Sequence, residues 1–121
     1  MGKDYEEIAS SLSKNLGDLH KQTAETTAGF GAMAKGALQD GTLSKKHKEL
    51  IDLAIGVAAK YDGCIAFHTK ALVELGVSRE EVGETLGMCV YMGADQFTCM
   101  RRTLLLHLTS FLKRINFKHF K

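Results

Sequence analysis

The chain is 121 residues long, which leaves room for one domain of ordinary size. Hydrophobic residues make up 45% of it and charged residues 25%, as in an average globular protein that buries a core. Its formal net charge is only +2, and it contains no proline and no tryptophan. Because nothing but glycine interrupts helices here, and strong helix formers are plentiful, the composition excludes a typical sandwich or barrel. We therefore expect a single all-α domain over residues 1–121.

Export and membrane insertion are not expected. Residues 1–20 carry Asp4, Glu6 and Glu7 and lack the apolar segment of a secretory signal. No stretch approaches the roughly 18 uninterrupted apolar residues that a membrane span needs. We expect a cytoplasmic location and no membrane partner. The three cysteines are then expected to be thiols, with at most one catalytic or regulatory disulfide.

Charge is spread unevenly along the chain. Residues 1–95 hold ten basic and fourteen acidic residues, whereas residues 96–121 hold six basic residues and no acidic one. A basic tail can indicate nucleic acid or an anionic surface. This tail lacks aromatic platforms and any recognisable binding motif, so we interpret it as a solvated helix face and expect no nucleic-acid partner.

Apolar residues recur at helical spacing, with turn signals between the runs. Ser44 fits the N-cap of a helix, Gly76 fits a C-terminal stop, and Ser78 with Glu81 forms a capping box. The six helices expected span residues 4–20, 23–38, 45–60, 64–75, 79–92 and 95–115. The apolar positions expected in the first three are Ile8, Leu12, Leu16, Leu19; Phe30, Met33, Leu38; and Leu50, Leu53, Ala54, Val57, Ala58. Helices joined by such short turns imply a compact bundle.

The residues best suited to chemistry are Cys64 and His68. A helix that begins near Cys64 places the thiol in its first turn, where free N–H groups and the helix dipole favour an anion. His68 follows four residues later, so it lies one turn further along the same face and can exchange a proton with the thiol. The same spacing also occurs in helices where a small cysteine is simply buried and the histidine is unrelated to it.

Glu49 borders the apolar stripe of the preceding helix. A carboxylate in such a setting can shuttle protons, whereas an exposed glutamate near a helix start would only complement the dipole. A zinc site is a further alternative, but Cys64 and His68 are only two local ligands and a structural site usually needs four. Glu49, Cys89 and Cys99 would have to converge on them. We therefore expect no metal and no cofactor.

The run from Cys64 to Leu72 closely resembles the core motif of the carboxymuconolactone decarboxylase-like superfamily. Its alkyl hydroperoxidase D-like members carry a glutamate, eleven residues, a cysteine, two residues, a second cysteine, three residues and a histidine. Glu49 stands at the position of that glutamate, Cys64 at that of the second cysteine and His68 at that of the histidine. The resemblance is strongest over residues 25–95, and three matches at fixed spacing favour a functional site.

The resemblance implies a helical fold that assembles as a trimer or hexamer. It also implies a thiol-dependent peroxidase, an oxidoreductase with antioxidant activity on hydroperoxides, in which Cys64 attacks and His68 and Glu49 relay protons. Other members of the superfamily are lyases that decarboxylate a ring-derived lactone, and such an enzyme would bind a small carboxylated compound, with Lys70 as the nearest local cation. A third alternative is a structural oligomer whose site has decayed.

The chain departs from the motif at Tyr61, which replaces the first cysteine of the pair. A disulfide between positions 61 and 64 is thus excluded, and oxidised Cys64 would need an external thiol reductant or a distant resolving cysteine. Cys89 and Cys99 are the internal candidates, if their Cα atoms come within roughly 7 Å. Tyr61 could donate a hydrogen bond to the thiol, or simply pack. The basic end beyond Gln96 also departs from the family's pattern, through lineage variation or a reading-frame change, which puts Cys99 in doubt.

Overall fold

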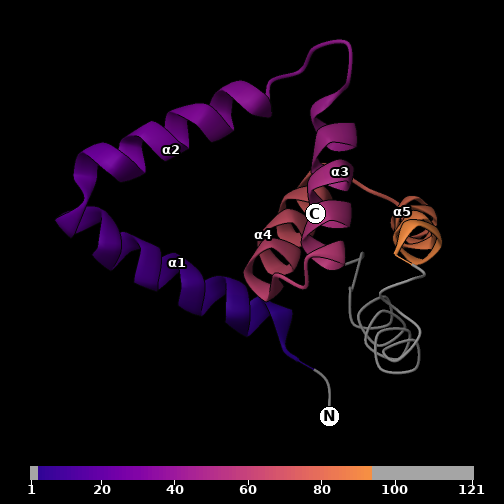
Figure 1. Cartoon of the computed structure of the whole chain (residues 1–121), viewed down its shortest axis with the longest axis horizontal. Coiled ribbons are helices and arrows are strands. Elements are labelled where there is room, and N and C mark those ends of the chain that lie inside the picture. The colour runs from indigo at the N-terminus through magenta and orange to yellow at the C-terminus, as the bar shows by residue number, and fades with distance from the viewer. Residues whose placement is uncertain (1–2, 94–121) are drawn as a thin grey trace.

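The computed structural model describes residues 3–93, and these form five α-helices without a strand. The helices are α1 (Tyr5–Gln22), α2 (Ala24–Ala37), α3 (Lys45–Ala58), α4 (Asp62–Glu74) and α5 (Arg79–Met92) (Figure 1). The expected all-α fold is confirmed, and the first five expected ranges match within two residues at every end. The sixth expected helix lies outside the described residues. No helix in the described part is both long and apolar enough to cross a membrane.

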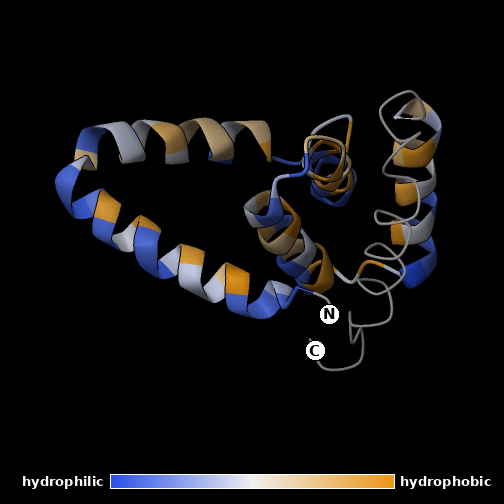
Figure 2. Cartoon of the chain, turned by 60° about the horizontal axis from the view of Figure 1, so that its bottom comes forward, coloured by the Kyte–Doolittle hydropathy of each residue, from blue (hydrophilic) through white to orange (hydrophobic). Residues whose placement is uncertain are grey.

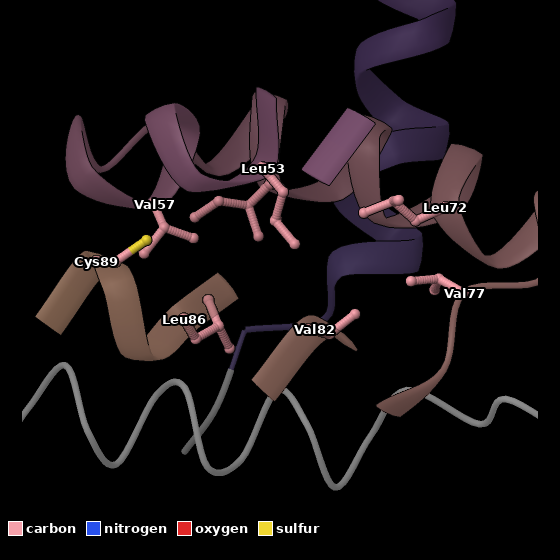
Figure 3. Close-up of a cluster of buried hydrophobic side chains, with 8 residues drawn as sticks. Leu53, Val57, Leu72, Val77, Val82, Leu86 and Cys89 are labelled. Carbon is pink, nitrogen blue, oxygen red and sulfur yellow. The ribbon is translucent and has the colours of Figure 1, made fainter. Parts of the chain in front are cut away.

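Three of these helices form the packed body, with α3 in the middle. It packs against α4 with one side and against α5 with another. The core residues lie where these sides meet, and Figure 3 shows most of them between α3 and α5. The buried cluster comprises Leu53, Val57, Ile65, Leu72, Val77, Val82, Leu86 and Cys89. Ala58 was expected in the buried stripe of α3 but is exposed, because it lies on the side of the helix that faces neither neighbour.

The body is joined to an arm made of α1 and α2 (Figure 1). The start of α1 packs on α4, where Leu12 lies close to Gly63. A helix of 18 residues is about 27 Å long and one of 13 residues about 20 Å, so α1 continues beyond α4. Leu16 and Leu19, on the same stripe as Leu12, are exposed there. Helix α4 therefore supports only the first half of α1.

Helix α2 packs chiefly against α1 and buries none of its residues. Phe30 is 68% exposed and Met33 is 64% exposed, although both were expected to make apolar contacts. Figure 2 shows hydrophobic residues along both helices of the arm. Within residues 3–93, Phe30 and Met33 of α2 are therefore not covered by the helices of the body.

The helix ends follow the local signals in the sequence. The Ser44 side chain accepts a hydrogen bond from the His47 N–H, and Ser78 and Glu81 form both hydrogen bonds of a capping box. Gly76 has a φ of 73°, the left-handed conformation that ends a helix most easily at glycine. Helix α4 begins at Asp62, two residues earlier than expected. The turn between α3 and α4 is consequently only three residues long.

Candidate functional site

The short turn after α3 sends α4 back along it, and this places the candidate residues opposite one another. Gly56, near the end of α3, lies against Cys64, near the start of α4. More than one helical turn away from the loop that joins α3 and α4, Glu49 and Asp52 of α3 lie against His68 of α4. Positions 49, 52 and 56 are three or four apart, so they share the side of α3 that faces α4.

Glu49 and His68 form the central contact of the site. The Nδ1 and Oε2 atoms lie 2.6 Å apart. An ionised carboxylate only accepts hydrogen bonds, so with Glu49 in that form it is the Nδ1–H of His68 that donates the hydrogen bond. The glutamate is 3% exposed, so its carboxylate is held by the fold and shielded from water. Sequence reasoning left open whether Glu49 was exposed at the helix start, and the structure buries it beside His68.

This contact determines which nitrogen of His68 is available for chemistry. When Nδ1–H donates to a carboxylate, the neutral ring keeps a lone pair on Nε2, which is then the basic atom. The His68 side chain is 25% exposed, whereas the side chain of its partner Glu49 is only 4% exposed. The arrangement is that of an oriented base with a fixed tautomer, as in nucleophile and base sites generally.

Asp52 is the residue of this cluster that sequence reasoning missed. One of its carboxylate oxygens lies 3.7 Å from Nδ1 of His68, and its side chain is 35% exposed. Its position three residues after Glu49 was the available signal, because it places both carboxylates on one side of α3. Glu49, Asp52 and His68 each offer a ligand atom within 4.8 Å of the other two, so together they could hold a metal ion.

Cys64 lies in the first turn of α4, one turn before His68. It is the third residue of the helix, and the N-cap residue Tyr61 provides no side-chain hydrogen bond to this turn. The thiol is neither fully buried nor fully exposed. A Cβ atom placed on Gly56 would lie 3.0 Å from Cys64 Cβ, closer than ordinary contact. The glycine therefore lets α3 approach the segment that carries the cysteine.

The remaining candidate residues do not belong to the cluster of Glu49, Asp52 and His68. The Tyr61 side chain is 64% exposed and forms no hydrogen bond within residues 3–93, so it does not donate to the thiol there. The Cys89 thiol donates to the carbonyl oxygen of Ala54 at 3.5 Å, on the side of α3 that faces α5. Cys64 contacts the side of α3 at Gly56, and residues two apart on a helix point in nearly opposite directions.

Cys89 and Cys64 therefore contact different sides of α3, the side that faces α5 and the side that faces α4. Burial also raises the pKa of the Cys89 thiol, which favours its protonated and unreactive form. Figure 3 shows Cys89 among the core residues beside Val57. Cys99 lies outside the described residues. Lys70, the cation named for a lactone-binding alternative, is exposed.

Comparison with known proteins agrees with this fold. The model of the carboxymuconolactone decarboxylase family matches residues 24–98. A crystal structure of a carboxymuconolactone decarboxylase family protein from Legionella pneumophila, in its apo form, is 38% identical, covers 96% of both chains and superposes with a TM-score of 0.79. An uncharacterised protein of Cupriavidus necator is 30% identical over 77% of this chain and 82% of its own. One from Haemophilus influenzae is 31% identical over 58% of this chain and 62% of its own.

Proposed function

This chain belongs to the carboxymuconolactone decarboxylase family, and on that premise we propose that it is a thiol-dependent peroxidase whose nucleophile is Cys64. The observation that supports this proposal best is the 2.6 Å contact between buried Glu49 and His68, with His68 one turn after Cys64 on the same helix. A buried carboxylate that orients a partly exposed histidine one helical turn from a cysteine has the parts of a nucleophile with its base.

In the proposed reaction His68 takes the thiol proton on Nε2, while Nδ1–H keeps its bond to Glu49. The imidazolium that results is stabilised by the Glu49 carboxylate. The Cys64 thiolate attacks the terminal oxygen of a hydroperoxide, and the O–O bond breaks as the S–O bond forms. His68 returns its proton to the departing alkoxide, so the products are an alcohol and a sulfenic acid on Cys64.

The sulfenic acid must then be reduced. Position 61 holds a tyrosine, and Cys89 contacts the side of α3 that faces α5. Neither residue is placed to resolve oxidised Cys64, so we propose that the reductant is an external thiol. One thiol displaces water from the sulfenic acid to form a mixed disulfide, and a second thiol releases Cys64 as a free thiol and leaves as part of a disulfide. A cytoplasmic location suits this cycle, since cellular thiols are kept reduced there.

Hydroperoxide consumption in excess dithiothreitol tests the assignment. Cys64→Ser should lower turnover to the level of buffer alone. Glu49→Gln keeps an oxygen that accepts from Nδ1 but loses the charge, so turnover should fall about tenfold to hundredfold. Glu84→Gln, an exposed change on α5, is the matched control and should match the wild type. Turnover that survives Cys64→Ser would contradict the proposed nucleophile.

Absence of turnover in all four proteins would favour the family's other chemistry. A lyase acting on a small carboxylated ring compound would use His68 as acid or base and would not need Cys64. Thermal stabilisation of the Cys64→Ser variant by lactone carboxylates would then support the lyase. Absence of both effects would leave a structural oligomer.

We also propose that the protein assembles as a homo-oligomer, a trimer or hexamer, through the arm. Exposed apolar residues lie on the second half of α1 and on α2, away from the contact of α1 with α4: Leu16, Leu19, Phe30 and Met33. Exposed apolar side chains concentrated in one region mark contact surfaces. Light scattering should give a multiple of the 13.3 kDa chain mass, and Phe30→Ser should lower it. A monomeric wild-type mass at micromolar concentration would contradict the proposal.

A further inference from the structure

Two carboxylates converge on a single imidazole in this site. Glu49 and Asp52 both approach Nδ1 of His68, at 2.6 and 3.7 Å. No lysine or arginine within residues 3–93 pairs with either carboxylate. A peroxidase relay of histidine and glutamate accounts for Glu49 but gives Asp52 no task. The cluster therefore holds one more anionic ligand than the relay requires.

From this geometry we propose that Glu49, Asp52 and His68 form a divalent-cation site, and that the ion it fits is Zn²⁺. Each residue offers one ligand atom within 4.8 Å of the other two, and they come from two helices packed against each other. Zinc binds imidazole nitrogen and carboxylate oxygen at about 2.0–2.2 Å, usually in tetrahedral geometry. One nitrogen with two oxygens is a donor set that zinc accepts more readily than magnesium or calcium.

The distances require only a small adjustment. Two ligand atoms on a tetrahedral zinc ion lie about 3.4 Å apart, given bonds of about 2.1 Å. The separation between His68 and Asp52 is 3.7 Å, which is already close to that value. The hydrogen-bonded pair of His68 and Glu49 is 2.6 Å apart and would have to open by less than about 1 Å. The Glu49 and Asp52 oxygens lie within 4.8 Å of each other, so they would have to approach by at most about 1.4 Å.

Burial also resembles that of an open metal site. Glu49 is enclosed by the fold, whereas Asp52 and His68 are each about one-quarter to one-third exposed. Three protein ligands with one side open to water are the arrangement of zinc sites that keep a fourth position for water or substrate. Cys64 does not belong to the group of three, so its thiol is not needed as a ligand.

Zinc would occupy the nitrogen that otherwise donates to Glu49. The zinc-bound state and the proton relay would thus exclude each other at His68, so zinc would act as an inhibitor of the proposed peroxidase. This consequence depends on the proposed function, whereas the binding itself does not. The test accordingly uses no activity.

Metal-free, untagged full-length protein is titrated with Zn²⁺ in competition with a chromogenic chelator. We expect one tight zinc ion per chain in the wild type and in Cys64→Ser. Asp52→Asn, which changes a partly exposed side chain, should lower the affinity for zinc at least tenfold. Asp18→Asn, an exposed change on α1, is the matched control and should leave the zinc affinity unchanged. Circular dichroism of each variant verifies that it is folded.

Binding of Co²⁺ adds a spectroscopic readout. A site of nitrogen and oxygen donors gives ligand-field bands without the intense near-ultraviolet charge transfer of a thiolate ligand. Equal zinc affinity in Asp52→Asn and the wild type, loss of the ion in Cys64→Ser, or a thiolate band with cobalt would each overturn the proposal. Since Cys64→Ser abolishes the proposed peroxidase but should retain zinc, failure of one proposal is distinguishable from failure of the other.

Discussion

The contact between Gly56 and Cys64 allows a sharp test of how the site is held together. Gly56 is buried on the side of α3 that faces α4, and an added Cβ would lie 3.0 Å from Cys64 Cβ. That Cβ is bonded directly to the backbone of α4, so no flexible side chain can move aside. Gly56→Ala should therefore push the two helices apart by a few tenths of an ångström near the nucleophile.

The expected change in the free energy of unfolding of Gly56→Ala follows from two opposing effects. Alanine favours a helix over glycine by about 1 kcal/mol. Overpacking a buried contact costs about 1–3 kcal/mol. The free energy of unfolding of Gly56→Ala should thus range from unchanged to about 2 kcal/mol lower. Gly17→Ala is the matched control, because Gly17 is exposed on α1 with nothing within 4 Å, and it should gain about 0.5–1 kcal/mol.

Thermal unfolding midpoints of both variants, together with hydroperoxide turnover, measure the effect. Gly56→Ala should melt several degrees below Gly17→Ala, at about 4 °C for each kcal/mol of difference. Its turnover should fall about tenfold because His68 on α4 moves away from Glu49 on α3, whereas Gly17→Ala should retain wild-type turnover. If Gly56→Ala melted as high as Gly17→Ala, the glycine would not be needed for the approach of α3 and α4, and the reasoning would be wrong.

Two further measurements test the electrostatics of the body. Hydrogen bonds from Lys46 and from the Ser78 N–H lower the pKa of Glu81 below 4.5, so its contribution to stability is present above that pH and is lost as the pH falls through the lowered value. The difference in melting temperature between the wild type and Glu81→Gln should accordingly be largest near neutral pH and shrink below pH 4.5; a constant difference would contradict the ion pair. Burial raises the pKa of the Cys89 thiol and so slows its reaction. In a Cys99→Ser protein, Cys64 should therefore react quickly with a disulfide reagent at neutral pH, and Cys89 should react only on unfolding. Two fast thiols would argue against the buried position of Cys89.

The proposed zinc site and the proposed relay give two distinct tasks to one cluster. Glu49 and His68 suffice to orient a base, and Asp52 adds the third ligand that a cation requires. Substitution of Asp52 therefore separates the two tasks, since it removes a ligand and leaves the hydrogen bond between Glu49 and His68 in place. A protein whose thiol chemistry is blocked by zinc would respond to the free concentration of that ion.

The sequence by itself determined the local features. Ser44, Gly76 and the capping box of Ser78 and Glu81 act within a few residues, so the ends of the helices could be predicted from them. The same holds for the placement of Cys64 and His68 one turn apart, which depends only on the period of the helix. The family motif then identified Glu49, fifteen residues before Cys64, as a partner of these residues.

Tertiary packing decided the rest, because it depends on the direction in which each helix leaves its turn. Only the return of α4 along α3 brings Glu49 and Asp52 to His68, and only the path of α5 on the other side of α3 keeps Cys89 away from Cys64. The exposed apolar residues of α2 are a similar case. Their helical spacing predicts a helix with an apolar face. The spacing is the same whether that face meets its own chain or another, so periodicity alone could not decide what the face contacts.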